Sequence, residues 1–421
     1  MLENTESLLP VPKPGTQIQV LTVGFETESL DELDMLLSTL GVKPVDRLEA
    51  QIRRINPGTY IGKGKIDEIK QRLVESKAEV VIVDVELSPN QLRNLEKEIG
   101  RPVLDRPGVI IEIFSRHART NESKTQVELA RMQYLLPRLA HFWSHFERQR
   151  GGGATSRGMG EKQIEVDRRL VKKRISVLNE RLDAIERERK VQRAGRRDVL
   201  KVALVGYTNA GKSTLLNALT QSNVLAENKL FATLDASVRS LDPFSHPPLV
   251  AIDTVGFISN LPHSLVASFR STLEELKEAD LLIHVVDASS PHAREQLKVT
   301  EEVLEELEVG DKPRMIVLNK ADLLPAGAGR NLARIIAPGA TAVSSFNEED
   351  VTKLRKQILD HFTRGMEVWE ILVPYAESKL ESQLHAHGSI EVTRHLEKGT
   401  FFRLRMEDGW ARKLKLEKYR L

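Results

Sequence analysis

The sequence predicts a multidomain α/β protein. A doubly wound sheet is expected in the middle, after a small α/β domain with a long helical hairpin and before a small α+β domain. Apolar runs of strand length alternate with helical spacing over residues 17–115 and again over 199–365, which is typical of α/β sheets. Between these regions, apolar residues recur every three, four or seven positions, as in a coiled coil. This seam consists of Ile164, Val171, Ile175, Leu178, Leu182 and Ile185.

Composition narrows the class of protein. The chain has 421 residues, of which 40% are hydrophobic and 29% charged, as in an ordinary soluble protein. It has no cysteine, which excludes disulfides and cysteine zinc sites. No apolar run reaches the roughly 18 residues of a membrane span, and no secretory signal is recognisable. We therefore expect a cytoplasmic protein, monomeric and without integral membrane contact.

Five segments are expected along the chain. They are a flexible tail (1–16), an N-terminal α/β domain (17–118), a helical hairpin with a Gly-rich loop (119–198), a nucleotide-binding domain (199–365) and a C-terminal α+β domain (366–421). The tail is expected because residues 1–16 are polar and contain three prolines, a composition that rarely packs at a terminus.

The N-terminal domain begins with alternating strands and helices. Ser88 is expected to cap a helix that starts at Pro89 and ends at Gly100, because Ser favours the N-cap, Pro the first turn and Gly the end. The other expected elements are strands at 18–23, 45–53 and 79–85, and helices at 30–40 and 66–76. The stretch Gly62-Lys63-Gly64-Lys65 is interpreted as an ordinary turn, with a phosphate-binding loop as the weaker alternative.

The hairpin is expected from about Thr120 to Arg197, with Pro137 ending or kinking its first helix. The Gly-rich segment Gly151–Gly160 would form its tip, because glycines at an exposed tip cost order and usually serve contact. From Arg116 to Asp198 the chain holds 21 Lys/Arg against 11 Asp/Glu. That excess indicates either a solvated coiled-coil surface or a surface for contact.

The last two domains complete the strand pattern. In the central domain, strands are expected at 200–205, 238–241, 249–253, 281–286, 314–319 and 340–343. In the C-terminal domain, a strand at 370–373 and a helix at 377–387 precede strands at 390–396, 400–405 and 410–416.

One stretch of the central domain carries a phosphate-binding pattern, G-x-x-x-x-G-K-S. It is Gly206-Tyr207-Thr208-Asn209-Ala210-Gly211-Lys212-Ser213, which follows an apolar run and precedes a helix that begins near Thr214. In this context the loop N–H groups and the helix N-terminus can bind phosphate oxygens. Lys212 would reach the β- and γ-phosphates, and the Ser213 hydroxyl would ligate Mg²⁺.

Two further motifs follow apolar strands in the expected order. In Asp253-Thr254-Val255-Gly256, the carboxylate would hold Mg²⁺ through water and the Gly256 N–H would meet the γ-phosphate. In Asn319-Lys320-Ala321-Asp322, the Asp322 carboxylate can accept from both N1–H and the 2-amino group of guanine. Adenine offers neither donor, so this motif predicts selection of GTP over ATP. Ser344-Ser345 would add backbone donors to the guanine O6.

Catalysis needs a threonine that completes the Mg²⁺ shell when GTP is bound. Thr233 is preferred, since Thr220 lies in a helix and Thr254 adjoins Asp253. Phe257 occupies the place where Ras-type enzymes carry a water-orienting Gln, so intrinsic hydrolysis is expected to be slow. Two roles remain open for Asn209: it steadies its own turn, or it holds a K⁺ ion that substitutes for an arginine finger. The expected catalytic residues are thus Lys212, Thr233, Gly256 and Asn209.

From about Gln17 onward, the chain resembles the HflX family of P-loop GTPases. The matching motifs are Tyr60–Lys65, Asp105-Arg106-Pro107-Gly108, Gln126–Ala130, Tyr134–Leu139, the Gly-rich loop with 161–169, Phe231-Ala232-Thr233-Leu234-Asp235, Asp253–Ile258 and Leu261-Pro262-His263. The resemblance implies switch segments at 231–235 and 253–263. The chain departs from the family at its loop, which is one residue longer, and at Lys162, where Thr is more common.

The resemblance further implies a GTPase that binds rRNA of the large ribosomal subunit and separates stalled ribosomes under stress. The hairpin residues expected to contact rRNA are Gly151, Gly152, Gly153, Arg157, Gly158, Gly160, Arg168, Arg169, Lys172 and Lys173. Three alternatives are considered. The hairpin could serve an RNA assembly or modification factor that acts on free RNA. The chain could be a membrane-surface scaffold, although no lipidation or amphipathic motif supports this. Gly62–Lys65 could bind ATP, as proposed for the N-terminal domain of some relatives.

Overall fold

The computed structural model describes most of the chain, in two compact units. The described residues are 7–9, 18–52, 54–139, 157–194, 199–220, 230–231, 237–242, 248–259, 275–325, 327–364, 366–406 and 408–421. The first unit comprises residues 1–190 with 227–235 and 259–272, and the second comprises 191–226, 236–258 and 273–421.

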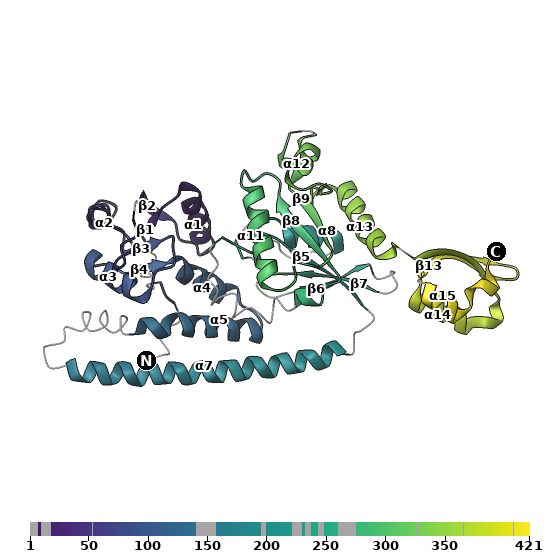
Figure 1. Cartoon of the computed structure of the whole chain (residues 1–421), viewed down its shortest axis with the longest axis horizontal. Coiled ribbons are helices and arrows are strands. Elements are labelled where there is room, and N and C mark those ends of the chain that lie inside the picture. Colours follow the sequence, from purple (N-terminus) through teal and green to yellow (C-terminus); the bar gives the residue numbers. More distant parts are fainter. Residues whose placement is uncertain are drawn as a thin grey trace. The chain divides into compact units, whose positions relative to one another are not determined.

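The first unit contains a four-stranded parallel sheet in the order β2-β1-β3-β4, covered by helices (Figure 1). Its strands are β1 (Val20–Gly24), β2 (Pro44–Glu49), β3 (Val80–Val83) and β4 (Val103–Asp105). Its first helices are α1 (Thr27–Thr39), α2 (Lys63–Ser76), α3 (Pro89–Ile99) and α4 (Arg106–His117). Helix α2 packs with α3, and α1 packs with α4. β3 is buried at every position, as expected for a parallel sheet covered on both faces.

Helix boundaries in this unit follow local capping chemistry. Ser88 accepts from the Gln91 N–H and the Gln91 side chain accepts from the Ser88 N–H, which makes a capping box. Gly100 ends the helix in the left-handed region, with φ +75°. Sequence analysis did not recognise α4. Asp105 caps it by accepting from the Gly108 N–H at 3.1 Å, and Pro107 occupies its first turn.

Two long helices of the first unit run antiparallel, α5 (Asn121–Leu135) and α7 (Arg157–Ala194). Glu128 of α5 pairs with Arg174, and Glu122 pairs with Arg189, each at 2.7 Å. A 3-10 turn at Leu136–Arg138 contains Pro137 and follows α5. The predicted seam packs inward. Val171 and Leu178 are buried, and the other seam residues whose side chains the structure describes are half-buried, namely Ile175, Leu182 and Ile185.

The N-terminal segment differs from the expected flexible tail. Leu9 is buried, and the Ser7 hydroxyl donates to Glu112 of α4 at 3.0 Å. The prediction is therefore wrong at residues 7–9, because the Ser7 hydroxyl and the Leu8 N–H both bond Glu112 of α4 and Leu9 is buried. The rest of the predicted tail lies outside the described residues.

The second unit contains a six-stranded sheet in the order β10-β9-β8-β5-β7-β6 (Figure 1). Its strands are β5 (Leu200–Val205), β6 (Ser237–Asp242), β7 (Leu249–Asp253), β8 (Leu281–Asp287), β9 (Arg314–Asn319) and β10 (Thr341–Ala342). All neighbours are parallel except β6, which runs antiparallel to β7. Its helices are α8 (Lys212–Thr220), α11 (Ala293–Glu306), α12 (Ala328–Ile336) and α13 (Glu348–Thr363), with a 3-10 turn η3 (Ala321–Leu323).

Helices cover both faces of this sheet, which confirms the doubly wound prediction. Val285 of β8 belongs to the core under α8 and α13, whereas Val286 belongs to the core under α11 and α12. Adjacent residues of one strand thus face opposite layers. In such a sheet, ligands bind at the carboxyl ends of the strands, and the motifs described below lie there.

A small antiparallel sheet forms the C-terminal part, in the order β11-β13-β12. Its elements are β11 (Glu367–Val373), α14 (Ser378–His387), β12 (Ser389–Leu396), β13 (Gly399–Met406) and α15 (Asp408–Leu414). The predicted strand at 410–416 is wrong. Asp408 pairs with Arg412 one helical turn later, and Trp410 and Leu414 pack on the core at i, i+4 spacing.

Candidate functional site

The loop after β5 has the backbone that phosphate binding requires. Gly206 and Gly211 have φ values of +148° and +87°, and a Cβ on Gly206 would collide with the Val285 carbonyl. Asn209 has φ 61°, a conformation that Asn tolerates better than most residues. Asn209 therefore has a backbone role in the turn, and binding of K⁺ by its side chain stays a proposal.

Lys212 lies at the start of α8 and is buried. Its Nζ donates to the Gly206 and Tyr207 carbonyls at 3.1 and 2.9 Å. Burial lowers the pKa of the Lys212 ammonium to about 8, and the Asp253 carboxylate opposes that shift. These two bonds hold the ammonium against the backbone of the phosphate loop.

A carboxylate and a hydroxyl suited to Mg²⁺ meet beside Lys212. Ser213 Oγ donates to Asp253 Oδ2 at 2.7 Å. Among the described residues, Oδ1 of the buried Asp253 has no hydrogen-bond partner. A buried oxygen that lacks a donor fits an outer ligand of a hydrated cation. The Thr254 hydroxyl instead donates to the Leu204 carbonyl at 2.6 Å, which agrees with preferring another threonine for the metal.

The residues after Asp253 are tied to the phosphate loop through their backbone. Thr208 N–H donates to the Phe257 carbonyl at 2.6 Å, and Phe257 N–H donates to the Gly206 carbonyl at 3.1 Å. A Cβ on Gly256 would lie 2.7 Å from Thr208 Cα and 3.0 Å from Lys212 Nζ. Only glycine fits there, and the Phe257 ring is buried, so this aromatic side chain cannot orient a water molecule.

A second cluster lies at the ends of β9 and β10. Asn319 Nδ2 donates to the Ala210 carbonyl at 3.0 Å, and Ser345 Oγ donates to Asn319 Oδ1 at 2.7 Å. Ser344 Oγ donates to Asp322 Oδ1 at 2.6 Å. The structure therefore brings the phosphate loop, the Asn319–Asp322 motif and the serine turn together.

Sequence analysis missed two carboxylates of this cluster. Asp350 of α13 accepts from the Ser344 N–H at 3.1 Å, so that donor is already engaged. The backbone donors predicted for the Ser344-Ser345 turn therefore do not include the Ser344 N–H. Asp287, at the end of β8, pairs with Lys320 Nζ at 2.7 Å, while Lys320 itself has φ 61°. Asp287 is distant in sequence from Lys320, and Asp350, although close to Ser344 in sequence, belongs to the first turn of α13, so neither carboxylate is part of a recognisable motif.

The expected first switch segment is only partly described. Phe231 is buried in the first unit, where its ring packs edge-on against Phe114 of α4 at 4.7 Å. Its side chain is thus a packing residue here. Ala232, Thr233, Leu234 and Asp235 lie outside the described residues. Ser259, which follows the second switch motif, also belongs to the first unit, and its carbonyl accepts from Arg106 at 3.2 Å.

The expected rRNA contacts of the hairpin fall into two groups. Gly151, Gly152 and Gly153 lie outside the described residues. Arg157, Gly158 and Gly160 lie in the first turn of α7, so the predicted loop is wrong over 157–160. Glycine costs only about 1 kcal/mol in a helix, which the long helix after it can offset. Arg168, Arg169, Lys172 and Lys173 are exposed on α7.

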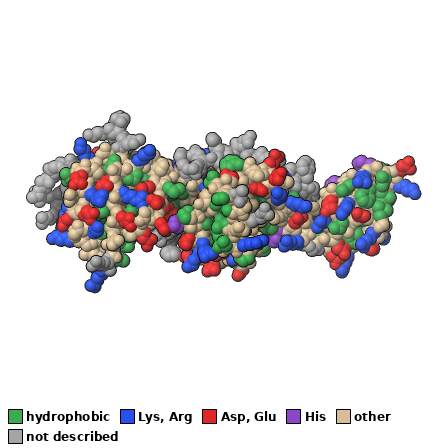
Figure 2. Space-filling view, turned by 90° about the horizontal axis from the view of Figure 1, so that it is seen from above, with side chains coloured by type: hydrophobic (Ala, Val, Ile, Leu, Met, Phe, Trp, Pro, Cys, Tyr) green, Lys and Arg blue, Asp and Glu red, His purple; other side chains and the backbone are tan. Residues whose placement is uncertain are grey.

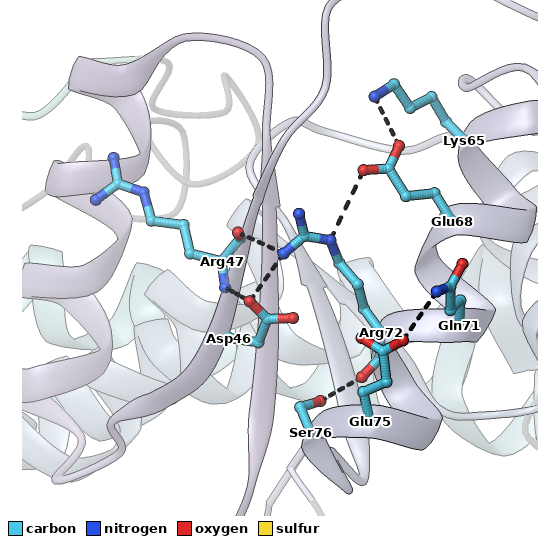
Figure 3. Close-up of polar contacts among 8 residues, drawn as sticks. All are labelled: Asp46, Arg47, Lys65, Glu68, Gln71, Arg72, Glu75 and Ser76. Atoms are coloured by element: carbon cyan, nitrogen blue, oxygen red, sulfur yellow. Dashed lines mark hydrogen bonds and ion pairs between the residues drawn. The ribbon is translucent and has the colours of Figure 1, made fainter.

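The stretch Gly62–Lys65 does not form a free loop. Gly62 is the N-cap of α2, and Lys63 to Lys65 form its first turn. Figure 3 shows Lys65 directed at Glu68, to which its Nζ bonds at 2.7 Å. Beside it, Arg72 bonds Asp46 of β2 at 2.9 Å and the Arg47 carbonyl at 3.3 Å. These contacts fasten α2 to β2. The predicted turn is wrong at Lys63–Lys65, because these residues begin α2.

Comparison with known proteins agrees with this geometry. Three family descriptions match: "GTP-binding GTPase N-terminal" over residues 27–115, "GTP-binding GTPase Middle Region" over 117–196 and "50S ribosome-binding GTPase" over 201–320. The GTPase HflX of Magnetococcus marinus is 44% identical over 87% of this chain and 85% of its own length. That of Caldanaerobacter subterraneus is 41% identical over 91% and 88%.

A solved structure is also similar over much of its length. It is a GTP-binding protein from the archaeon Sulfolobus solfataricus in complex with GDP, 25% identical over 82% of this chain and 99% of its own, with a TM-score of 0.43. In the described part of the chain, no helix is long and apolar enough to cross a membrane. Each of these two relatives is more than 40% identical to this chain over most of its length. The chain belongs to the HflX family of GTPases.

Proposed function

We propose that this GTPase binds the large ribosomal subunit in the cytoplasm and separates stalled ribosomes, with the α5–α7 hairpin as its arm. Hydrolysis of GTP follows from the family. The ribosomal partner is supported by the description of the matched domain as a "50S ribosome-binding GTPase". The remaining support comes from the surface of α7.

The exposed basic row of α7 carries this proposal. Val171 is buried toward the rest of the first unit, while Arg168, Arg169, Lys172 and Lys173 are exposed on the same turns. On the face shown in Figure 2, acidic and basic side chains lie interspersed. On α7, four exposed cations fall within six residues, 168–173. Such a row suits phosphates along an RNA backbone.

At the nucleotide, the roles proposed for Lys212, Ser213, Asp253, Gly256 and Asp322 are supported by the geometry above, and that of Thr233 by its place in the sequence. Lys212 would bind the β- and γ-phosphates, and the Gly256 N–H would contact the γ-phosphate. Ser213 and Thr233 would ligate Mg²⁺ directly, with Asp253 holding it through water. When bound, the ion neutralises charge on the transferred phosphoryl group. Asp322 would accept from the guanine edge. With Phe257 buried, water must be oriented by another group, for which K⁺ at Asn209 or a ribosomal element is proposed.

Sedimentation with ribosomes and separated subunits tests the partner. We expect co-sedimentation with the large subunit in a non-hydrolysable GTP analogue and much less in GDP, because the γ-phosphate orders the switch segments. Equal binding in both nucleotides, or binding to free RNA as tight as to subunits, would favour the RNA assembly or modification factor instead.

Two charge-reversal variants separate the arm from general electrostatics. Lys172→Glu with Lys173→Glu should weaken subunit binding and reduce the slope of log affinity against log salt, by about 0.7 to 0.9 per lost phosphate contact. Lys353→Glu with Lys356→Glu changes as many charges on exposed positions of α13 and should leave that slope unchanged. Replacing residues 151–156, which precede α7, should abolish subunit separation but spare nucleotide binding. If that variant still separates ribosomal subunits at the wild-type rate, the proposal that the α5–α7 hairpin is the ribosome-binding arm is wrong.

A further inference from the structure

Both expected switch segments are shared between the two units. Residues 227–235, which include Thr233, and residues 259–272 belong to the first unit, whereas the phosphate loop and the Asp253–Ile258 motif belong to the second. The chain therefore passes from one unit to the other next to each group expected to meet Mg²⁺ or the γ-phosphate. It follows that contacts within the first unit act on both segments.

The first segment is held at Phe231. Its ring is buried and packs edge-on against Phe114 of α4, with centroids 4.7 Å apart and an angle of 82° between the rings, a favoured geometry for aromatic pairs. Its backbone has φ 55°, in the left-handed region that bulky residues rarely adopt. Such a backbone persists only where its surroundings impose it. The contact with Phe114 thus holds a strained residue two positions before Thr233.

The second segment is held at Ser259. Its carbonyl accepts from Arg106 Nη2 at 3.2 Å. The Arg106 guanidinium is buried and is fixed by Asp84, 2.6 Å from Nη1, and by Glu32, which bonds Nη2. Arg106 begins α4, and Phe114 lies near the end of the same helix. One helix therefore contacts both segments.

We propose that α4 is a latch on both switch segments, and that Phe114 and Arg106 thereby set how strongly the protein distinguishes GTP from GDP. This inference rests on the roles proposed above for Thr233 and Gly256. GTP requires Thr233 to reach Mg²⁺ and the chain after Gly256 to close on the γ-phosphate, whereas GDP requires neither. Contacts that keep the segments on α4 therefore compete with GTP and leave GDP binding unchanged.

The strained φ of Phe231 suits a contact that is made and released. Burial of the ring stabilises the latched arrangement, while the left-handed backbone opposes it. The apparent affinity for a nucleotide falls with the fraction of protein that is not competent to bind it. A latch therefore changes the affinity for GTP alone, whereas contacts that only join two domains have no effect on one nucleotide over the other.

Calorimetric titration of the full-length protein with GDP and with a non-hydrolysable GTP analogue, each with Mg²⁺, tests the latch. Phe114→Leu removes the aromatic contact but keeps an apolar side chain in the core. It should tighten the GTP analogue by about fivefold or more, as for a typical coupling between sites, and leave the Kd of GDP unchanged. Ile69→Val trims a buried residue of α2 in the same unit and should change neither Kd. If Phe114→Leu changes the ratio of the two Kd values by less than this, or in the opposite direction, the latch is wrong.

Substitutions of Phe231 test the strain without altering α4. Phe231→Ala and Phe231→Gly both remove the ring, but only glycine adopts a positive φ without cost. The latched arrangement should therefore be weaker in the alanine variant, which should favour the GTP analogue more than the glycine variant does. A preference in the glycine variant that equals or exceeds that of the alanine variant would contradict a strained latch.

Arg106 and Glu32 offer a matched pair for the second contact. Arg106→Lys keeps a cation beside Asp84 but lacks the second nitrogen that reaches the Ser259 carbonyl, so it should raise the preference for the GTP analogue. Glu32→Gln alters the same ion-pair network, keeps that nitrogen and should not. Equal effects of the two changes would remove Arg106 from the latch.

Thr233→Ala separates the latch from the switch assignment. It should weaken the GTP analogue and spare GDP, because the hydroxyl is proposed to ligate Mg²⁺ only when GTP is bound. If the analogue is not weakened, the role of Thr233 is wrong. If it is weakened but neither Phe114→Leu nor Phe231→Ala changes the ratio of the two Kd values, only the latch fails.

Discussion

Replacing Asp105 by Asn should destabilise the first unit strongly without altering the nucleotide site. This carboxylate is fully buried and accepts from four donors. They are Tyr134 Oη at 2.7 Å, Gly108 N at 3.1 Å, Leu87 N at 3.2 Å and Arg138 Nη2 at 3.2 Å. Burial raises the pKa of the Tyr134 hydroxyl, so it remains a donor. Burial also raises the pKa of Asp105, with the Arg138 charge opposing this.

The magnitude follows from which contacts the amide can keep. Asn is as good an N-cap as Asp, so the bond from Gly108 can survive at Oδ1. At the other position an NH₂ group would face the N–H donors of Leu87 and Arg138, and the buried guanidinium would lose its counter-charge. Leaving one partner of a buried pair unpaired costs about 3–5 kcal/mol. The Arg138 contacts to the Tyr134 and Leu87 carbonyls, both 2.9 Å, would remain.

The assay is hydrogen exchange of β3 peptides, followed by mass spectrometry. It reports the stability of the first unit alone, whereas the melting curve of the whole chain would combine the unfolding of several domains. The expected cost corresponds to exchange faster by about two to three and a half orders of magnitude. Ser88→Ala, which removes only an exposed cap of the same unit, should cost about 1 kcal/mol. Peptides of β9 serve as an internal reference. The reasoning fails if Asp105→Asn accelerates β3 exchange no more than Ser88→Ala does.

Two further predictions concern the nucleotide site. With the pKa of Lys212 lowered to about 8, below its ordinary value, the ligand-free protein loses this proton as pH rises past 8. Bound phosphate should restore it, so GDP binding should take up more protons near pH 9 than near pH 7.5, where the terminal phosphate of GDP is already ionised. Calorimetry in buffers of different ionisation enthalpy would show no buffer dependence at pH 9 if this is wrong. Asp287→Asn should raise the Kd for GDP about two- to tenfold, because it frees the half-buried Lys320 side chain. In a double-mutant cycle with Lys320→Met, the two effects on Kd should not add. Additive effects would contradict a shared role of the two residues.

Local cues predicted some elements well and failed at others for identifiable reasons. Helix α3 was predicted from Ser88 to Gly100 because both of its ends are fixed by neighbouring residues. Helix α4 was not recognised, since Val109 to Phe114 is an apolar run interrupted only by Glu112, which shows no helical periodicity because all of its residues are buried. Its N-cap is Asp105, whose other partners, Leu87, Tyr134 and Arg138, lie outside α4. Helix α15 was mistaken for a strand because seven residues give too short a pattern to distinguish the two periods.

The difference between local and distant contacts also explains which residues of the nucleotide site could be predicted from the sequence. Lys212, Asp253 and Asn319 belong to contiguous motifs, so sequence alone identifies them. Asp287 and Asp350 act through side chains that reach other segments, and a single carboxylate at a strand or helix end carries no signature.

The motif residues of the first unit serve a different purpose from those of the second. Asp105 and Arg106 were singled out through family resemblance, yet both are buried in ion-pair networks. Arg106 bonds Asp84 at 2.6 Å and also bonds Glu32, and Asp105 joins β4 to Arg138 after α5. A buried charge tolerates few alternative partners, because an unpaired one is strongly destabilising. Such pairs fix how α4 and the turn after α5 sit against the sheet. In the second unit, by contrast, Ser344 and Asp322 lie on turns at strand ends and bond each other directly. The motifs of the first unit therefore specify one arrangement of helices, and those of the second present groups to a ligand.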